Sequence, residues 1–109
     1  MKSGNRDRLV TIERDGGTSE DAFGGVQSGW ASYCTAWCEV IYGSGQERRD
    51  AGLEGADQPA TFRTLASTET LAVTVADRIN FDGFYWDITN VSPLDRDGVE
   101  WTAIRRASA

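Results

Sequence analysis

The sequence predicts an all-β fold: a small antiparallel β-barrel of six or seven strands, with one long loop or short helix after the second strand. Three observations lead to this prediction. Apolar and polar residues alternate over short segments, turn signals separate these segments regularly, and β-branched and aromatic residues are abundant for a chain of 109 residues. Because a chain of this length usually forms one domain, we expect residues 1–109 to share a single thin core.

The first half of the chain contains the first two predicted strands. Residues 9–14 alternate, with Val10 and Ile12 on one face. Residues 15–21 are polar, acidic and contain glycine, which predicts a projecting loop. Residues 26–42 form the longest strand candidate. Large apolar groups on both faces of this strand suggest that its own core covers one face and a neighbour covers the other.

The second half of the chain reads as a series of short strands. Asp82-Gly83 is the strongest hairpin signal in the sequence, because these residues tolerate the positive φ of a two-residue turn. After this turn Phe84, Trp86 and Ile88 fall on alternate positions and are expected to share one buried face. The predicted strands span residues 60–66, 71–75, 78–81, 84–91 and 99–106.

Residues 43–59 interrupt the strand pattern. Ser44 followed three residues later by Glu47 fits a capping box, so we expect at most one short helix, within residues 44–55. A connection of this length inside a compact domain is uncommon and is usually functional where it occurs. Residues 1–7 are polar, and we expect them to be flexible until a partner orders them.

The charge and the cysteine content exclude several classes of function. Lys and Arg number 11 and Asp and Glu number 17, and the net charge of −6 disfavours wrapping around a nucleic acid but suits a passage through which DNA slides. The chain has no His, so the commonest general base and zinc ligand is missing. Cys34 and Cys38 on one strand would lie too far apart for a disulfide. We therefore predict no catalytic residue, no cofactor and no metal site.

The residue types leave two other classes of function to consider. A small β-barrel could bind single-stranded nucleic acid or an oligosaccharide on a platform of aromatic residues, here Trp30, Tyr33, Trp37, Trp86 and Trp101. Core or interface packing is favoured, because basic residues do not interleave with these aromatics. A metal-dependent hydrolase would need three or more converging carboxylates. No apolar run is long enough to cross a membrane, and we expect a reducing, soluble compartment.

Several short motifs follow one another in a defined order. The first half contains Arg8-Leu9-Val10-Thr11-Ile12, Asp21-x-x-Gly24-Gly25, Trp30, Trp37-Cys38-Glu39-Val40 and Gly45-x-Glu47. The second half contains Phe62-Arg63, Asp77-Arg78-Ile79 and Asp82-Gly83-Phe84-Tyr85-Trp86-Asp87-Ile88. In this order and spacing, residues 6–106 resemble the tailed-bacteriophage head–tail joining proteins, also called stoppers, head–tail adaptors or head completion proteins. Gene transfer agents use similar parts.

The resemblance implies a structural virion protein that is not an enzyme. Such proteins form a homo-oligomeric ring, here of six or twelve subunits, in the neck of the particle. A portal or adaptor protein lies on one side of the ring and a tail terminator protein on the other, and assembly takes place in the cytoplasm of the bacterial host. Double-stranded DNA passes through the ring without sequence-specific binding, and no membrane takes part. Both the stopper and the adaptor role stay open.

The resemblance also implies where the functional residues lie. The loop of residues 43–59 would project into the channel and close it behind packaged DNA, through Gly43, Gly45, Gln46, Glu47, Arg48, Arg49, Asp50, Glu54 and Asp57. A ring also needs apolar surface between its subunits. The candidates for this surface are Trp30, Tyr33, Trp37, Ile41 and Trp101.

Overall fold

The computed structural model describes residues 6–16, 19–20, 26–27, 29–43 and 57–105, so residues 1–5 of the N-terminal segment lie outside it. The described chain is nearly all strand. Its elements are β1 (Arg8–Asp15), β2 (Ser19–Glu20), β3 (Val26–Gln27), β4 (Trp30–Tyr42), β5 (Gln58–Leu65), α2 (Thr68–Leu71), β6 (Arg78–Phe81), β7 (Phe84–Leu94) and β8 (Gly98–Arg105). No helix in these ranges is long and apolar enough to span a membrane.

Six of the strands close into an antiparallel barrel, in the order β1-β4-β5-β8-β7-β6 and back to β1. This order confirms the predicted fold class and the predicted number of strands. The pairing of β5 with β8 runs through both strands without a register shift. The pairing of β1 with β6, which closes the barrel, involves only Thr11–Glu13 and Arg78–Asn80. We call the pairing of β5 with β8 the long seam and the pairing of β1 with β6 the short seam.

Large aromatic side chains fill much of the small barrel. Phe62 packs edge-on against Trp86 and Phe81, with ring centroids 5.4 and 5.9 Å apart. The indole N–H of Trp86 donates to the Phe81 carbonyl oxygen at 3.3 Å, which satisfies its buried donor. The buried core consists of Val10, Ile12, Ala36, Cys38, Ala60, Phe62, Val73, Ile79, Phe81, Trp86, Ile88, Val99, Trp101 and Ala103.

The hairpin between β6 and β7 forms where the sequence predicts it. The φ angles are 57° at Asp82 and 79° at Gly83, as a type I′ turn requires. Trp86 and Ile88 are buried as expected. Phe84 is 47 % exposed, so the prediction that it shares their buried face is wrong. It is the first residue after the turn, at the end of the strand, and the guanidinium of Arg105 lies over its ring at 4.3 Å.

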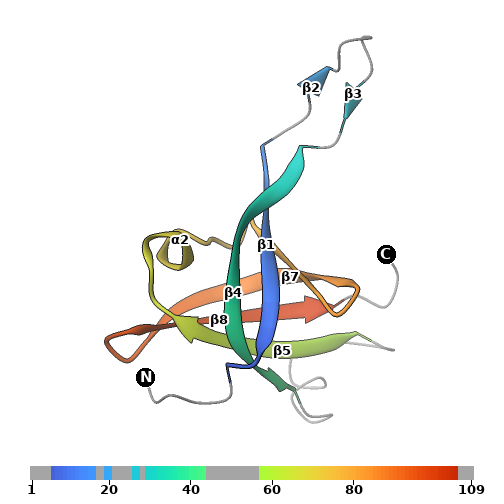
Figure 1. Ribbon diagram of the computed structural model, residues 1–109. Coiled ribbons are helices and arrows are strands. Elements are labelled where there is room, and N and C mark those ends of the chain that lie inside the picture. The colour runs from blue at the N-terminus through green and yellow to red at the C-terminus, as the bar shows by residue number, and fades with distance from the viewer. Residues whose placement is uncertain (1–5, 17–18, 21–25, 28, 44–56, 106–109) are drawn as a thin grey trace.

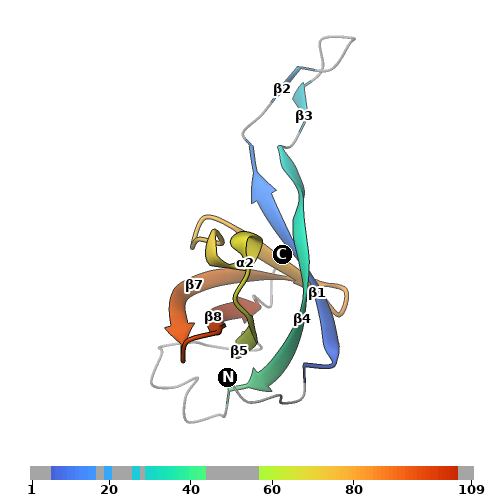
Figure 2. The same ribbon diagram turned by 60° about the vertical axis from the view of Figure 1, so that its left-hand side comes forward.

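β1 and β4 continue past the barrel as a two-stranded ribbon, with β2 and β3 paired at its far end (Figures 1 and 2). We call residues 13–16 and 29–33, together with β2 and β3, the arm. The N–H of Gly16 donates to the carbonyl oxygen of Gly29 at 3.0 Å, between the two pairs of strands. The segment predicted as an acidic loop thus contains the end of β1 and all of β2. The long strand predicted after it is divided into β3 and β4.

The segment after β5 also differs from its prediction. The sequence predicts a strand over residues 71–75, but the structure has α2 followed by turns. The Ser67 hydroxyl accepts the Thr70 N–H at 3.1 Å, and the Thr70 hydroxyl accepts the Ser67 N–H at 2.7 Å. This capping box favours a helical turn over the strand that apolar alternation suggests, and within residues 71–75 only Val73 is buried. The helix expected within 44–55 lies outside the described residues.

Candidate functional site

The loop predicted to face the channel leaves and re-enters the barrel at one fixed point. The Gly43 N–H donates to the Pro59 carbonyl oxygen at 2.9 Å. The side-chain amide of Gln58 donates to the carbonyl oxygens of Gly43, at 3.2 Å, and Pro59, at 2.7 Å. Asp57 is partly buried just before this contact. The other predicted loop residues lie outside the described part of the chain: Gly45, Gln46, Glu47, Arg48, Arg49, Asp50 and Glu54.

Two of the predicted interface residues lie on the outer surface of β4. Trp37 is 56 % exposed and Ile41 is 40 % exposed. Trp37 lies opposite Leu9 of β1, which is also exposed. Exposed Leu65 of β5 lines with Trp37 a shallow hollow of about 260 Å³. We call Leu9, Trp37, Ile41 and Leu65 the apolar face.

Trp101 is not a surface residue, and the prediction that it contacts a neighbouring subunit is wrong. Its side chain is fully buried, and its backbone pairs with Phe62 on one side and Val91 on the other. It points inward because alternate residues of β8 face the core, with Val99 and Ala103 on the same side. Its Nε1 finds no hydrogen-bond partner among the described residues, so it contributes bulk to the core rather than a polar contact.

The remaining two interface candidates lie where the arm leaves the barrel, and both are covered by arginines. The guanidinium of Arg14 lies over the Tyr33 ring, with Cζ 3.7 Å from the ring centroid. The guanidinium of Arg78 lies over the Trp30 ring at 4.1 Å. These stacked pairs belong to two arginine clusters, one on each face of the ribbon. The aromatics that could have formed one stacking platform are thus divided among the core, the apolar face and these clusters.

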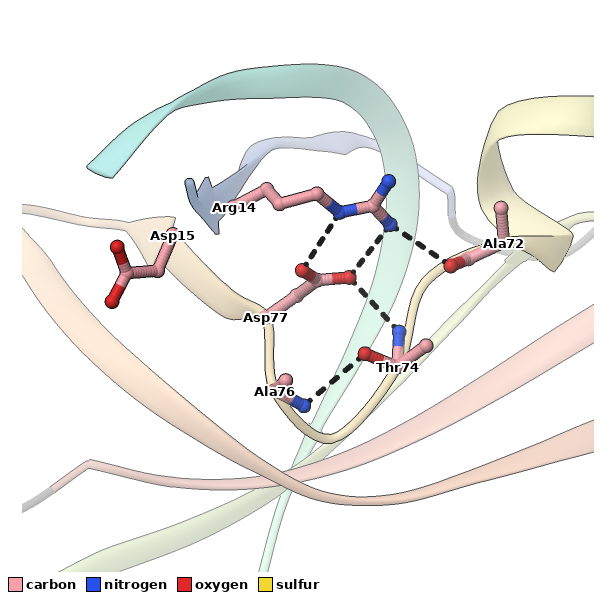
Figure 3. Close-up of a pocket in the computed structure, with 6 residues that line it drawn as sticks. All are labelled: Arg14, Asp15, Ala72, Thr74, Ala76 and Asp77. Carbon is pink, nitrogen blue, oxygen red and sulfur yellow. Dashed lines mark hydrogen bonds and ion pairs between the residues drawn. The ribbon is translucent and has the colours of Figure 1, made fainter. Parts of the chain in front are cut away.

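The first cluster is centred on Asp77, whose side chain is only 2 % exposed. Arg14 donates to both carboxylate oxygens, from Nε and Nη2, each at 3.0 Å (Figure 3). Its Nη2 also donates to the Ala72 carbonyl oxygen at 2.9 Å. The Thr74 N–H donates to the Asp77 carboxylate at 2.9 Å. Because these bonds are charge-assisted and bidentate, they tie β1 firmly to the segment between α2 and β6.

The charges of this cluster stabilise each other. Burial alone would raise the pKa of Asp77, but the hydrogen bonds from Arg14 and Thr74 and the charge of Arg14 hold that pKa below its usual range. The hydrogen bond with Asp77 raises the pKa of Arg14. Both groups are therefore charged at neutral pH. An open hollow of about 500 Å³ lies beside them, but its Arg and buried Asp are already paired with each other.

The second cluster is centred on Arg78. Its Nε donates to Oε1 of Glu13 at 2.7 Å, and the side-chain amide of Asn80 donates to Oε2 of the same carboxylate at 3.3 Å. The guanidinium lies between Trp30 and Tyr85, with Cζ 4.1 and 3.8 Å from their ring centroids. The side chains of Arg78 and Glu13 are 21 % and 14 % exposed. This cluster brings together β1, β4, β6 and β7 at the short seam.

A third arginine lies on the outer surface of the long seam. Arg63 of β5 contacts Glu100 of β8 at 2.9 Å and Glu39 of β4 at 3.9 Å. Its side chain is 38 % exposed, and Glu39 lies two residues from Trp37 on the same face of β4. A charged row therefore runs beside the apolar face.

No pattern in the sequence assigns a role to Arg14 or predicts the contacts of Asp77 and Arg78. Asp77-Arg78 stands out in the sequence only as one motif in an ordered series. The sequence does indicate that these residues have partners, because charged residues on half-buried strands are usually paired. The partners lie more than sixty positions away in the sequence, and only the pairing of β1 with β6 brings them together.

The described residues offer little for covalent or metal chemistry. Cys34 and Cys38 are free thiols on β4. Burial raises the pKa of Cys38 to about 12 and also raises that of Cys34, so neither is a reactive thiolate at neutral pH. Within the described ranges no three Cys, Asp or Glu side chains gather as metal ligands. What the described surface presents is an arm, an apolar face and the base of a loop.

Comparisons with known proteins agree with the fold. A chain from the virion of a native gene transfer agent particle is 24% identical with a TM-score of 0.66, over 94% of this chain and 96% of that chain. Protein SF1141 from Shigella flexneri 2a is 19% identical with a TM-score of 0.68, over 100% of both chains. No curated protein matches. The family model for the phage head completion protein matches residues 1–107, and the chain therefore belongs to this family of structural virion proteins.

Proposed function

We propose that this head completion protein forms a homo-oligomeric ring of six or twelve subunits in the neck of the virion. The family assignment over residues 1–107 carries the proposal, because it makes the chain a structural component of the virion. The ring would lie between the portal or adaptor complex and the tail terminator protein and provide the site of tail attachment. The fold that this chain shares with a chain of a gene transfer agent virion supports such a place in a particle.

The apolar face supports contact between subunits. Single exposed apolar residues are ordinary on a protein surface. Here Leu9 and Trp37 lie opposite each other on neighbouring strands, and Leu65 shares a hollow with Trp37. Arg63 and its acidic partners border this surface, as the polar rim of an interface does. Trp37 would be the main anchor, because buried tryptophans often dominate interface energies.

The proposed channel function rests on the loop of residues 43–59 and on the net charge of −6. The hydrogen bond from the Gly43 N–H to Pro59 and the bonds of the Gln58 side chain hold both ends of the loop at one point of the barrel, so the whole segment can extend from there towards the ring axis. Like charge between an acidic ring and DNA prevents the DNA from sticking as it passes. Arg48 and Arg49 would pair with acids of neighbouring loops and keep the channel closed until a tail attaches.

Native mass spectrometry and electron microscopy of the protein with its portal and tail partners test the ring. The wild-type chain should assemble as a closed ring on the portal. Trp37→Asp should keep the circular dichroism spectrum of the barrel but lose the ring. Leu71→Asp is the matched control, because Leu71 is 62 % exposed on α2 and lies outside the apolar face. If the Trp37→Asp variant still forms rings, the interface between subunits lies elsewhere. If the wild-type chain forms no ring, the proposal is refuted.

The channel role has a separate test. Deletion of residues 46–56 should leave the barrel folded and able to join its ring, because the hydrogen bonds at Gly43 and Pro59 stay in place. Filled heads that carry this deletion should lose DNA before a tail attaches. Normal retention of DNA would show that the loop is not the gate and would favour the adaptor role.

A further inference from the structure

The arm needs support that its own backbone does not provide. At its base Glu13 still pairs with Arg78 of β6, but beyond this point β1 and β4 pair only with each other (Figures 1 and 2). A two-stranded ribbon by itself is marginally stable in water. Left alone, such a ribbon would sample many directions relative to the barrel.

Side chains at the base of the arm supply this support on both of its faces. Glu13 and Arg14 are successive residues of β1, so their side chains point to opposite faces of the ribbon. Glu13 binds Arg78 on one face, and Arg14 binds Asp77 on the other. Because Asp77 and Arg78 are also successive residues, both faces are tied to the same short piece of chain.

A β-bulge places one aromatic residue of β4 in each cluster. Ile12 lies opposite Cys34, but Glu13 lies opposite Ser32, so Tyr33 is the extra residue on β4. The Tyr33 ring stacks under Arg14, at 3.7 Å. Trp30 is held by Arg78 on the other face. Each arginine thus binds a carboxylate and stacks on a ring. Arg14 of β1 contacts β4 and Asp77, and Arg78 of β6 contacts both β1 and β4.

We infer that Arg14 and Arg78 are positioning residues that fix the direction in which the arm leaves the barrel. The planar guanidinium suits this task, since it can pair with a carboxylate and stack on an aromatic ring at the same time. The arm then presents β2 and β3 to a neighbouring virion subunit in a preset orientation, which lowers the entropy cost of assembly. This last consequence rests on the proposed function, whereas the fixed direction is a property of the isolated chain.

Amide residual dipolar couplings and ¹⁵N relaxation of the isolated subunit test the inference. In the wild-type protein, amides of residues 13–16 and 29–33 should fit the same alignment tensor as those of β5 and β8. In the double variant Asp77→Asn with Arg78→Gln, the couplings of the arm should deviate from the values that this tensor predicts. The order parameters of the arm amides should fall from about 0.85, typical of a rigid backbone, to below about 0.6. The couplings of β5 and β8 should stay mutually consistent.

The control is Arg63→Gln. Arg63 also contacts two acids, but on the long seam away from the arm, so this variant should leave the arm couplings unchanged. If the double variant does not fold, Arg78→Gln alone takes its place, because Asp77 keeps its partners there. The inference would be overturned if the couplings of the wild-type arm required an alignment tensor different from that of the barrel. It would also be overturned if the arm of the double variant still fitted the alignment tensor of the barrel. Neither result depends on ring formation, so a fixed arm on a chain that forms no ring would refute only the proposed function.

Discussion

The long seam between β5 and β8 and the short seam between β1 and β6 close the same barrel by different means. The long seam has an unbroken backbone ladder, and its arginine, Arg63, lies on the surface. The short seam has paired backbone only at Thr11–Glu13, and the carboxylates that its arginines bind, Asp77 and Glu13, are largely buried. Where the ladder is short, side chains carry the connection. The same type of interaction, arginine with carboxylate, should therefore contribute very differently at the two seams.

The largest effect is expected at the short seam, for Asp77→Ala. The substitution removes three hydrogen bonds made to the carboxylate, two from Arg14 and one from the Thr74 amide. We expect the free energy of unfolding to fall by about 2–3 kcal/mol, less than for a fully buried pair because the Arg14 side chain can reach water. Urea unfolding followed by tryptophan fluorescence measures this change. A loss no larger than that of a surface pair would remove the distinction between the seams.

The same pair predicts how stability depends on pH. The pKa of Asp77 in the folded protein lies below its usual range, whereas in the unfolded chain it is about 3.9. The stabilisation is therefore present above pH about 4 and is lost as pH falls through the lowered pKa of the folded state. Thermal unfolding of the wild type and of Asp77→Asn should differ by a constant amount from about pH 5 to 8 and converge in more acidic buffer. Curves that stay equally far apart down to pH about 2 would contradict this assignment.

A smaller effect is expected for the second cluster of the short seam. Arg78 and Glu13 are partly exposed, but each has further contacts, with Tyr85 and Asn80 among them. A double-mutant cycle of Arg78→Gln and Glu13→Gln should give a coupling free energy of about 1 kcal/mol, since the pair is charge-assisted and mostly shielded from water. Independent, additive effects of the two substitutions would show that the rings rather than the carboxylate hold Arg78.

The two seams also differ in how far the sequence predicts them. The strands of the long seam follow from alternation and from turns, because each strand shows its own pattern of buried residues. The hairpin at Asp82-Gly83 is likewise local, and the structure confirms it. Features of this kind can be predicted from the sequence, because they depend only on residues that are close together in the chain.

The short seam cannot be found in this way. The pairs Arg14 with Asp77 and Glu13 with Arg78 join residues 63 and 65 positions apart, and no local pattern connects them. The error at Trp101 has a different cause. Val99, Trp101 and Ala103 alternate with Glu100 and Thr102, so the local pattern already places Trp101 on the buried face of β8, and the prediction of an interface role overlooked it. The strand predicted at 71–75 fails because the capping box at Ser67 is a local signal stronger than apolar alternation.

The smallest effect is expected at Arg63, and it makes the comparison sharpest. Arg63 contacts Glu100 at 2.9 Å and Glu39 at 3.9 Å, so it has two acidic partners where Arg78 has Glu13. Its carboxylate partners, however, are 26 % and 29 % exposed, whereas Asp77 is 2 % exposed, so water can replace the contacts of Arg63 at little cost. The backbone ladder beneath it is complete without the side chain. Arg63→Gln should therefore change the free energy of unfolding by about 0–1 kcal/mol, and the change should shrink further in high salt.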